Sequence, residues 1–158
     1  VYKAFSGALA LRLQKTIESR TSPCQKGFLS GRRISEVLAN VIDEAHNDTS
    51  NLEYSKALIC LDMSKAFDTV LQPHIFETLE LWNTGQTTID YIKLCLKDKQ
   101  GFILGDAPGS KSKPFEISRG VAQGDKNSPL LFILALEPLI ARINAFFLKR
   151  YKLRLDEA

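Results

Sequence analysis

The stretch NSPLLFILALEPLIARI, residues 127–143, decides the fold because it combines a clear helix start with an almost continuous apolar surface. Asn127 or Ser128 can cap the first turn, and Pro129 suits the first helical position, where no backbone N–H is needed. Residues 130–143 are apolar nearly all round at first, which is the pattern of a buried helix. We therefore expect this helix to be the most buried element.

Apolar residues before this stretch predict four more helices and a small sheet. Helical periodicity covers residues 3–19, 34–42, 73–82 and 89–96. Two short apolar runs, 102–104 and 115–117, are separated by turn residues and predict a hairpin. The run KALICL, residues 56–61, predicts a strand that is buried on both faces. This order of elements favours an α+β fold, rich in helices and with a short antiparallel sheet.

Composition and layout limit the possible functions only weakly. The 158 residues hold 21 Lys and Arg and 18 Asp and Glu, and the net charge of +3 permits nucleic-acid binding without indicating it. No apolar run approaches the roughly 20 residues that a membrane-spanning helix needs. No repeat or linker divides the chain, so we expect one domain or a fragment of one, cut from a longer protein.

The segment LDMSKAFD, residues 61–68, is the first candidate for chemistry. It places Asp62 at the end of the predicted buried strand and Asp68 six residues later. A carboxylate at the edge of an apolar core needs a partner, and Mg²⁺ is a suitable one because it takes carboxylate and phosphate oxygens. Alternatively, both aspartates are cap or turn residues that open the next helix.

The segment RGVAQGDKNSPLLF, residues 119–132, is the second candidate. Gly120 and Gly124 let the backbone approach a ligand closely, and Gln123 can hydrogen-bond a sugar or a base edge. Arg119 adds a positive charge, and the start of the following helix favours an anion such as phosphate. The simpler alternative is a glycine-rich connection that only begins a helix.

In this order the two segments resemble signature motifs of the reverse transcriptases of non-LTR retrotransposons. LDMSKAFD resembles the first palm motif, L-D-x-x-K-A-F-D, and RGVAQGDKNSPLLF resembles the second, R-G-x-x-Q-G-x-x-x-S-P-x-L-F. Upstream, SPCQKGFLSGRRISE, residues 22–36, resembles the segment Q-x-G-F-x-x-G-R-x-I that precedes the palm. ALEPLIARI, residues 135–143, resembles the usual continuation after the second motif.

The resemblance implies that residues 1–158 are part of a reverse transcriptase domain with a partial right-hand polymerase fold. Residues 1–54 would be helices on the fingers side, residues 55–145 would be the palm with both motifs, and residues 146–158 would be a truncated tail. The implied activity is that of an RNA-directed DNA polymerase, a nucleotidyltransferase.

The resemblance also implies roles for single residues of the first motif. Asp62, with the backbone carbonyl of Met63 beside it, would bind two Mg²⁺ ions. In such two-metal chemistry one ion activates the primer 3′-hydroxyl and the other stabilises the leaving pyrophosphate. Phe67 would lie beneath the deoxyribose and reject a 2′-hydroxyl, and Asp68 would cap a helix or lie near the nucleotide sugar.

Further residues would bind nucleotide or nucleic acid. Gln123 and Gly124 would contact the incoming nucleotide, while Arg119 would lie near the template or the nucleotide. Arg32 and Arg33 would contact phosphates of the RNA template and DNA primer, which are held mainly through their backbones. Deoxynucleoside triphosphates and the remainder of the retrotransposon polyprotein complete the implied partners, with no membrane, in the nucleus of a eukaryotic host.

The sequence departs from the family pattern at one important place. The third palm motif, Phe/Tyr-x-Asp-Asp, does not occur, and one aspartate cannot hold both ions well. We therefore expect the isolated chain to be inactive and the full-length protein to be the polymerase. Two alternatives remain: a catalytically inactive remnant that binds nucleic acid or a protein, and a related polymerase such as a group II intron maturase.

Overall fold

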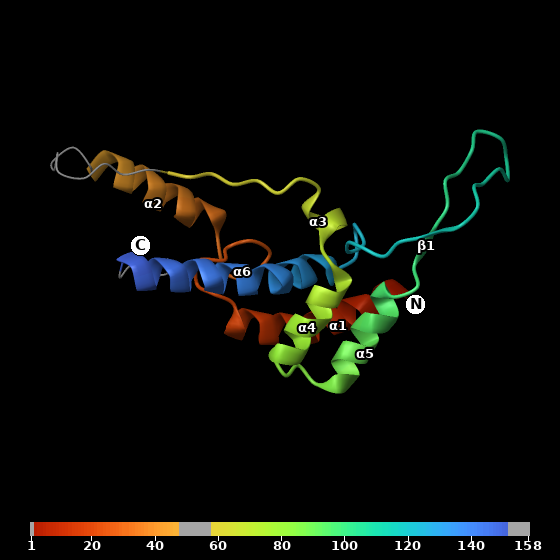
Figure 1. Cartoon of the computed structure of the whole chain (residues 1–158), viewed down its shortest axis with the longest axis horizontal. Coiled ribbons are helices and arrows are strands. Elements are labelled where there is room, and N and C mark those ends of the chain that lie inside the picture. Colours follow the sequence, from red (N-terminus) through yellow and green to blue (C-terminus); the bar gives the residue numbers. More distant parts are fainter. Residues whose placement is uncertain (1, 48–57, 152–158) are drawn as a thin grey trace.

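The structure, a computed structural model, describes residues 2–47 and 58–151 (Figure 1). All the predicted helices are present, several of them longer than expected. The helices in chain order are α1 (Tyr2–Arg20), α2 (Ile34–Asn47), α3 (Ala66–Thr69), α4 (Gln72–Leu81), α5 (Gln86–Leu96) and α6 (Ser128–Tyr151). Only α3, a single turn, was not expected from the periodicity. Together with one short antiparallel sheet, these helices confirm the helix-rich α+β prediction.

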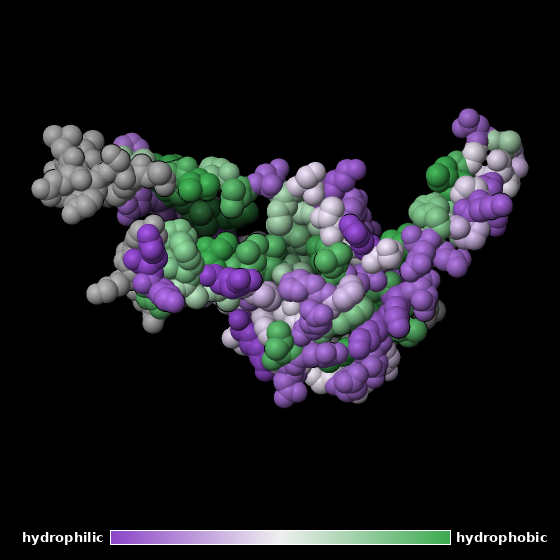
Figure 2. Space-filling view, in the orientation of Figure 1, coloured by the Kyte–Doolittle hydropathy of each residue, from purple (hydrophilic) through white to green (hydrophobic). Residues whose placement is uncertain are grey.

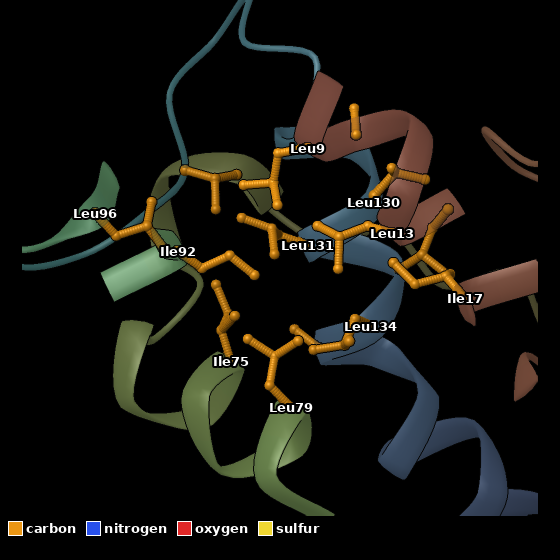
Figure 3. Packing of buried hydrophobic residues seen from close by; sticks show 14 of the residues in the cluster. Leu9, Leu13, Ile17, Ile75, Leu79, Ile92, Leu96, Leu130, Leu131 and Leu134 are labelled. Carbon is orange, nitrogen blue, oxygen red and sulfur yellow. The ribbon is translucent and has the colours of Figure 1, made fainter. Parts of the chain in front are cut away.

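One apolar core joins α1, α4, α5 and α6. The helix α6 packs against both α1 and α4, and α5 packs against α4. Figure 3 shows side chains from the four helices converging on one centre. They include Leu9, Leu13 and Ile17 of α1, Ile75 and Leu79 of α4, Ile92 and Leu96 of α5, and Leu130, Leu131 and Leu134 of α6. The core therefore fixes where the loop before α6 lies relative to the other helices.

The burial of α6 differs between its two halves. Its first half supplies more of the core than any other segment described here, as predicted, but Leu139 and Phe146 in its second half are exposed. Among the described residues, α6 is the one helix long and apolar enough to cross a membrane. The first half of this helix packs in the core, through Leu130, Leu131 and Leu134.

The predicted hairpin is confirmed, with shorter strands than expected. The strand β1 (Gln100–Gly101) pairs antiparallel with β2 (Phe115–Glu116), and an isolated bridge joins Leu104 to Lys111 nearer the tip. Pairing begins before residue 102 because Gly101 has no Cβ, and the ring of Phe115 lies where that atom would be. The hairpin extends away from the core (Figure 1).

The prediction of a buried strand at residues 56–61 is wrong for the part that the structure describes. Residues 58–61 form no strand, and their apolar side chains are exposed, with Leu61 at 86%. Residues 56 and 57 lie outside the described residues. An apolar run becomes a buried strand only where a neighbouring strand pairs with it, and none among residues 2–47 and 58–151 does so.

The helix α2 is amphipathic as predicted, but its apolar face is not covered. Ile34, Leu38 and Ile42 are all exposed. Figure 2 shows apolar side chains gathered over α2 and towards α6, while the surface of α4 and α5 below them is largely polar. Residues 34–47 thus form a helix whose apolar side chains do not contribute to the core.

The core predicts a large difference between two leucine substitutions. Leu134→Ala, at a side chain with 0% exposure, should lower the free energy of unfolding by about 2–5 kcal/mol, because it leaves a cavity among four helices. Leu81→Ala, at a side chain with 81% exposure, should change it by less than about 0.5 kcal/mol. Urea unfolding followed by circular dichroism measures both, and equal losses would contradict this core.

Candidate functional site

Two segments far apart in the sequence are joined by their backbones. The N–H of Gly120 donates to the carbonyl of Val70 at 2.8 Å, and the N–H of Val121 donates to the carbonyl of Phe67 at 2.9 Å. A β-bridge pairs Leu71 with Arg119. These bonds bring the residues after Asp62 against the loop that carries Gln123. We call residues 67–71 and 119–121 the junction.

Gly120 is required at the junction for two separate reasons. Its φ is +79°, a backbone conformation that residues with a side chain rarely adopt. A Cβ at this position would also lie 2.8 Å from the carbonyl oxygen of Asp68, 2.9 Å from its Cα and 2.9 Å from the carbonyl oxygen of Phe67. Gly124 has a φ of +81° but open space around it, so only its backbone conformation calls for glycine.

Asp62 lies in the exposed segment that leads into the junction. The side chain is exposed, and Met63 beside it is 47% exposed. The expectation that Asp62 stands at the edge of a buried strand and therefore needs a partner is wrong, because water solvates its carboxylate. Within residues 2–47 and 58–151, no hydrogen-bond or ion-pair partner of this carboxylate is present.

Phe67 connects the junction to α6 through its ring. It stacks on Phe132 with ring centroids 4.9 Å apart and an interplanar angle of 20°, and it meets Phe28 edge to face at 6.1 Å. The side chain is half-buried against the core. Contacts of this kind favour one ring orientation, so the ring of Phe67 is held in place by two other rings.

Asp68 and Gln123 meet across the junction. The amide nitrogen of Gln123 donates to Oδ1 of Asp68 at 3.4 Å, a long hydrogen bond between two exposed side chains. Arg119 is also exposed, and its backbone pairs with Leu71 in the junction. The structure therefore brings the side chains of Asp68 and Gln123 together at the junction, which also contains Arg119.

A buried polar network, which the sequence did not indicate, anchors this loop to α1. The hydroxyl of Ser6 donates to Oδ1 of Asp125, which also accepts the backbone N–H of Asn127 at 2.9 Å. The amide nitrogen of Asn127 donates back to the hydroxyl of Ser6 at 2.9 Å. Ser128 donates to the carbonyl of Ala122 at 2.6 Å. The side chains proposed as helix caps therefore hold the loop that carries Gln123.

Arg32 is surrounded by backbone carbonyls. Its guanidinium donates to the carbonyls of Glu18, Thr21, Ser22 and Gln25, at distances from 2.5 to 3.3 Å. These contacts join the last turn of α1, through the carbonyl of Glu18, to the turn that follows it. Arg32 is thus engaged within the chain, whereas Arg33 is exposed. Their contacts with nucleic acid stay predictions.

Glu137 of α6 reaches the same turn from the other side. Its Oε1 accepts the backbone N–H of Ser22 at 2.6 Å, while its Oε2 is buried with no hydrogen-bond partner in the described part of the chain. Burial raises the pKa of Glu137 above its ordinary value of 4.5, although the hydrogen bond from Ser22 and the charge of Arg32 both act to lower it. No sequence pattern indicated this carboxyl.

An open cavity of about 600 Å³ lies between α1, Phe28 and the start of α6. Small residues of α1, Ala4, Gly7 and Ala8, line it together with Lys3 and Lys126. Gly7 leaves room for the side chain of Lys126, which would lie 3.4 Å from a Cβ there. The cavity therefore has an apolar wall, an aromatic ring at its edge and two positive charges.

The described residues do not make a complete metal centre. Within the part of the chain that the structure describes, no group of three or more His, Cys, Asp or Glu side chains lies close enough to hold an ion. Asp62 and the carbonyl of Met63 are oxygen donors of the kind that Mg²⁺ prefers. They fit one corner of such a centre and not the whole of it.

Comparison with known proteins gives consistent matches across the chain. Residues 1–154 match the family described as reverse transcriptase (RNA-dependent DNA polymerase). The chain is 34% identical over 139 residues to a Retrovirus-related Pol polyprotein from type-1 retrotransposable element R2 of Popillia japonica, covering 87% of the chain and 19% of that protein. It is 30% identical over 138 residues to the corresponding polyprotein from type-2 element R2DM of Drosophila melanogaster, covering 87% and 13%.

A third relative is the Transposon TX1 uncharacterized 149 kDa protein of Xenopus laevis. It is 28% identical over 158 residues, which covers 98% of the chain and 12% of that protein. The chain thus spans less than a fifth of the length of each of these relatives. No solved structure matches it.

The close approach of the backbones at Gly120 predicts that alanine costs more stability there than at Gly109, which has the same φ. Gly109→Ala, at φ +79° in open space, should cost only the strain of the left-handed conformation, about 1–2 kcal/mol. Gly120→Ala, also at φ +79°, adds a clash with the backbone of Phe67 and Asp68 and should cost about 2–5 kcal/mol. Urea unfolding measures the two costs, and a Gly120→Ala cost no larger than that of Gly109→Ala would exclude the close approach.

The raised pKa of Glu137 predicts that the stability of the folded chain depends on pH. Because its pKa is higher in the folded chain than in the unfolded one, its contribution is fully present below pH 4.5 and is lost as the pH rises through the raised value. Glu137→Gln keeps the acceptor for Ser22 and does not titrate. Its stability relative to the parent should therefore grow from pH 4.5 to pH 8 in urea unfolding, and a difference that stays constant with pH would contradict the raised pKa.

Proposed function

Because the chain belongs to the reverse transcriptase family, we propose that it forms part of the active site of an RNA-directed DNA polymerase. The junction is the observation that carries this proposal, since it holds the segment after Asp62 against the loop that contains Gln123. We further propose a partial right-hand polymerase fold, with residues 1–54 on the fingers side, residues 55–145 in the palm and residues 146–158 as a tail. The alternative of an inactive remnant is not favoured.

Asp62 is the proposed catalytic carboxylate. Its exposed side chain and the carbonyl of Met63 would hold part of a Mg²⁺ centre. When bound, such ions activate the primer 3′-hydroxyl and neutralise charge on the leaving pyrophosphate. One side-chain carboxylate does not hold two ions, so the remaining ligands would come from substrate phosphates and from elsewhere in the polyprotein.

The incoming deoxynucleoside triphosphate would lie on the exposed surface of the junction. The ring of Phe67, fixed by Phe132 and Phe28, would form the floor under the sugar and leave no room for a 2′-hydroxyl. Gln123 and Gly124 would contact the nucleotide, and Asp68 orients Gln123 through its long hydrogen bond. Such preset contacts position the reacting groups before the chemical step.

The template would approach through the cavity beside Phe28. Lys3 and Lys126 are placed to contact phosphates, and the exposed ring of Phe28 offers a surface on which an unpaired base can stack. Arg119 would add a further contact near the nucleotide, and Arg33 a phosphate contact of the primer–template. Arg32 would contribute its charge near the phosphates, since its guanidinium also binds four carbonyls of the chain.

The chain alone and a longer protein that contains it should differ in primer extension. With an RNA template, an annealed DNA primer, Mg²⁺ and deoxynucleotides, we expect the longer protein to extend the primer and the chain alone not to. Asp62→Ala in the longer protein should reduce the rate by at least about 100-fold, as expected for the loss of a group that stabilises a transition state. Asp106→Ala, at an exposed aspartate in the hairpin, serves as the matched control.

Two results would contradict the proposal. One is a longer protein that extends no primer under any of these conditions. The other is an Asp62→Ala variant as active as Asp106→Ala, because the carboxylate would then have no part in the reaction.

A further inference from the structure

Phe28 has an unusual backbone conformation for its residue type. Its φ of +56° lies in the left-handed region, which bulky side chains rarely occupy. The side chain is 61% exposed, so burial of its ring does not explain the strain. A strained residue persists only when its surroundings hold it, and such residues concentrate at functional sites.

Two contacts anchor the loop around Phe28: the guanidinium of Arg32 and the side chain of Leu29, which is buried in the core. Residues 21–33 form an irregular connection between α1 and α2, and the carbonyls of Thr21, Ser22 and Gln25 all accept from the one guanidinium. The side chain of Gln25 in turn accepts the N–H of Gly27 at 3.0 Å, next to the strained residue. Removing the guanidinium would take this donor from the carbonyls of Thr21 and Gln25, while the carbonyl of Ser22 would keep the N–H of Gln25 at 3.1 Å.

Glu137 fixes this loop to α6. Its Oε1 accepts the N–H of Ser22, whose carbonyl accepts from Arg32, so the two charged residues hold opposite sides of one peptide segment. Glu137 is 7% exposed and its Oε2 has no partner among residues 2–47 and 58–151, which makes it a costly residue for a purely structural contact. The same helix carries Phe132, on which Phe67 stacks.

The tip of the loop reaches the proposed nucleotide site. The ring of Phe28 meets Phe67 edge to face with centroids 6.1 Å apart, and it also borders the cavity beside α1. Phe28 thus stands between the proposed template path and the proposed sugar-binding ring. A small rotation of the loop would move this ring away from Phe67.

We propose that Arg32 and Glu137 are positioning residues that hold Phe28 against Phe67 and thereby set the discrimination between deoxyribonucleotides and ribonucleotides. The part of this inference that concerns substrate discrimination rests on the proposed function, whereas the positioning of Phe28 does not. If both residues only stabilised the fold, their loss would lower the amount of active protein and leave the ratio of the two substrates unchanged.

Substrate discrimination in the longer protein is the first test. Arg32→Lys keeps the charge but cannot bridge the carbonyls with a planar fork. It should lower the ratio of kcat/KM for a deoxynucleotide to that for its ribonucleotide by about tenfold, within the range that one steric contact in a pocket supplies. Phe28→Ala should have the same effect, and the double variant should add nothing, because both remove one contact.

Glu137 offers a conservative rescue. Glu137→Leu removes the acceptor for Ser22 and should lower the ratio, whereas Glu137→Gln keeps that acceptor and should restore it. Lys26→Ala, which breaks an exposed ion pair of the same loop with Glu36, is the matched control and should leave the ratio unchanged. An unchanged ratio in Arg32→Lys and in Glu137→Leu would overturn the proposal.

A second measurement on this chain alone separates the two proposals. Nuclear Overhauser contacts between the rings of Phe28 and Phe67 should be present in the parent and lost in Arg32→Lys, while amide protection in the first half of α6 is kept. Contacts that survive in Arg32→Lys would refute the positioning role. If the longer protein extends no primer while these contacts behave as expected, the proposed function fails and the positioning stands.

Discussion

The close approach of two backbones at Gly120 is the constraint on which the candidate site depends. Two hydrogen bonds and a β-bridge hold residues 67–71 against residues 119–121, at a distance that leaves no room for a Cβ. Every side chain proposed to act on the nucleotide lies on one of these segments or within a few residues of it. The glycine therefore determines whether Asp62 and Gln123 can serve one substrate.

The helix α6 is the common support for these parts. Its first half fills the core, its Phe132 lies under Phe67, and its Glu137 binds the loop that ends at Arg32. The polar network of Ser6, Asp125 and Asn127 ties the loop before α6 to α1. Because α6 or the loop directly before it supplies one partner of each of these contacts, a change in the packing of α6 would reach the whole site.

Much of the helical fold could be predicted, because a single amphipathic or apolar helix is specified by its own periodicity. Residues 130–143 are an example. The strand at 56–61 was predicted wrongly because burial of a strand depends on a neighbour, which a local pattern does not reveal. The part of the candidate site that came from motifs, Asp62, Phe67 and Gln123, was named in advance, but its geometry was not.

The remaining contacts had no local signal at all. Arg32 binds backbone carbonyls, which every residue carries, and Ser6 meets Asp125 from the far end of the sequence.

Amide hydrogen exchange of the longer protein, with and without an RNA–DNA primer–template and the next deoxynucleotide, tests the account most directly. We expect the amides of residues 62–71, of residues 119–124 and around the cavity beside Phe28 to become protected together. Protection confined to the hairpin at residues 100–117 would contradict the proposed site.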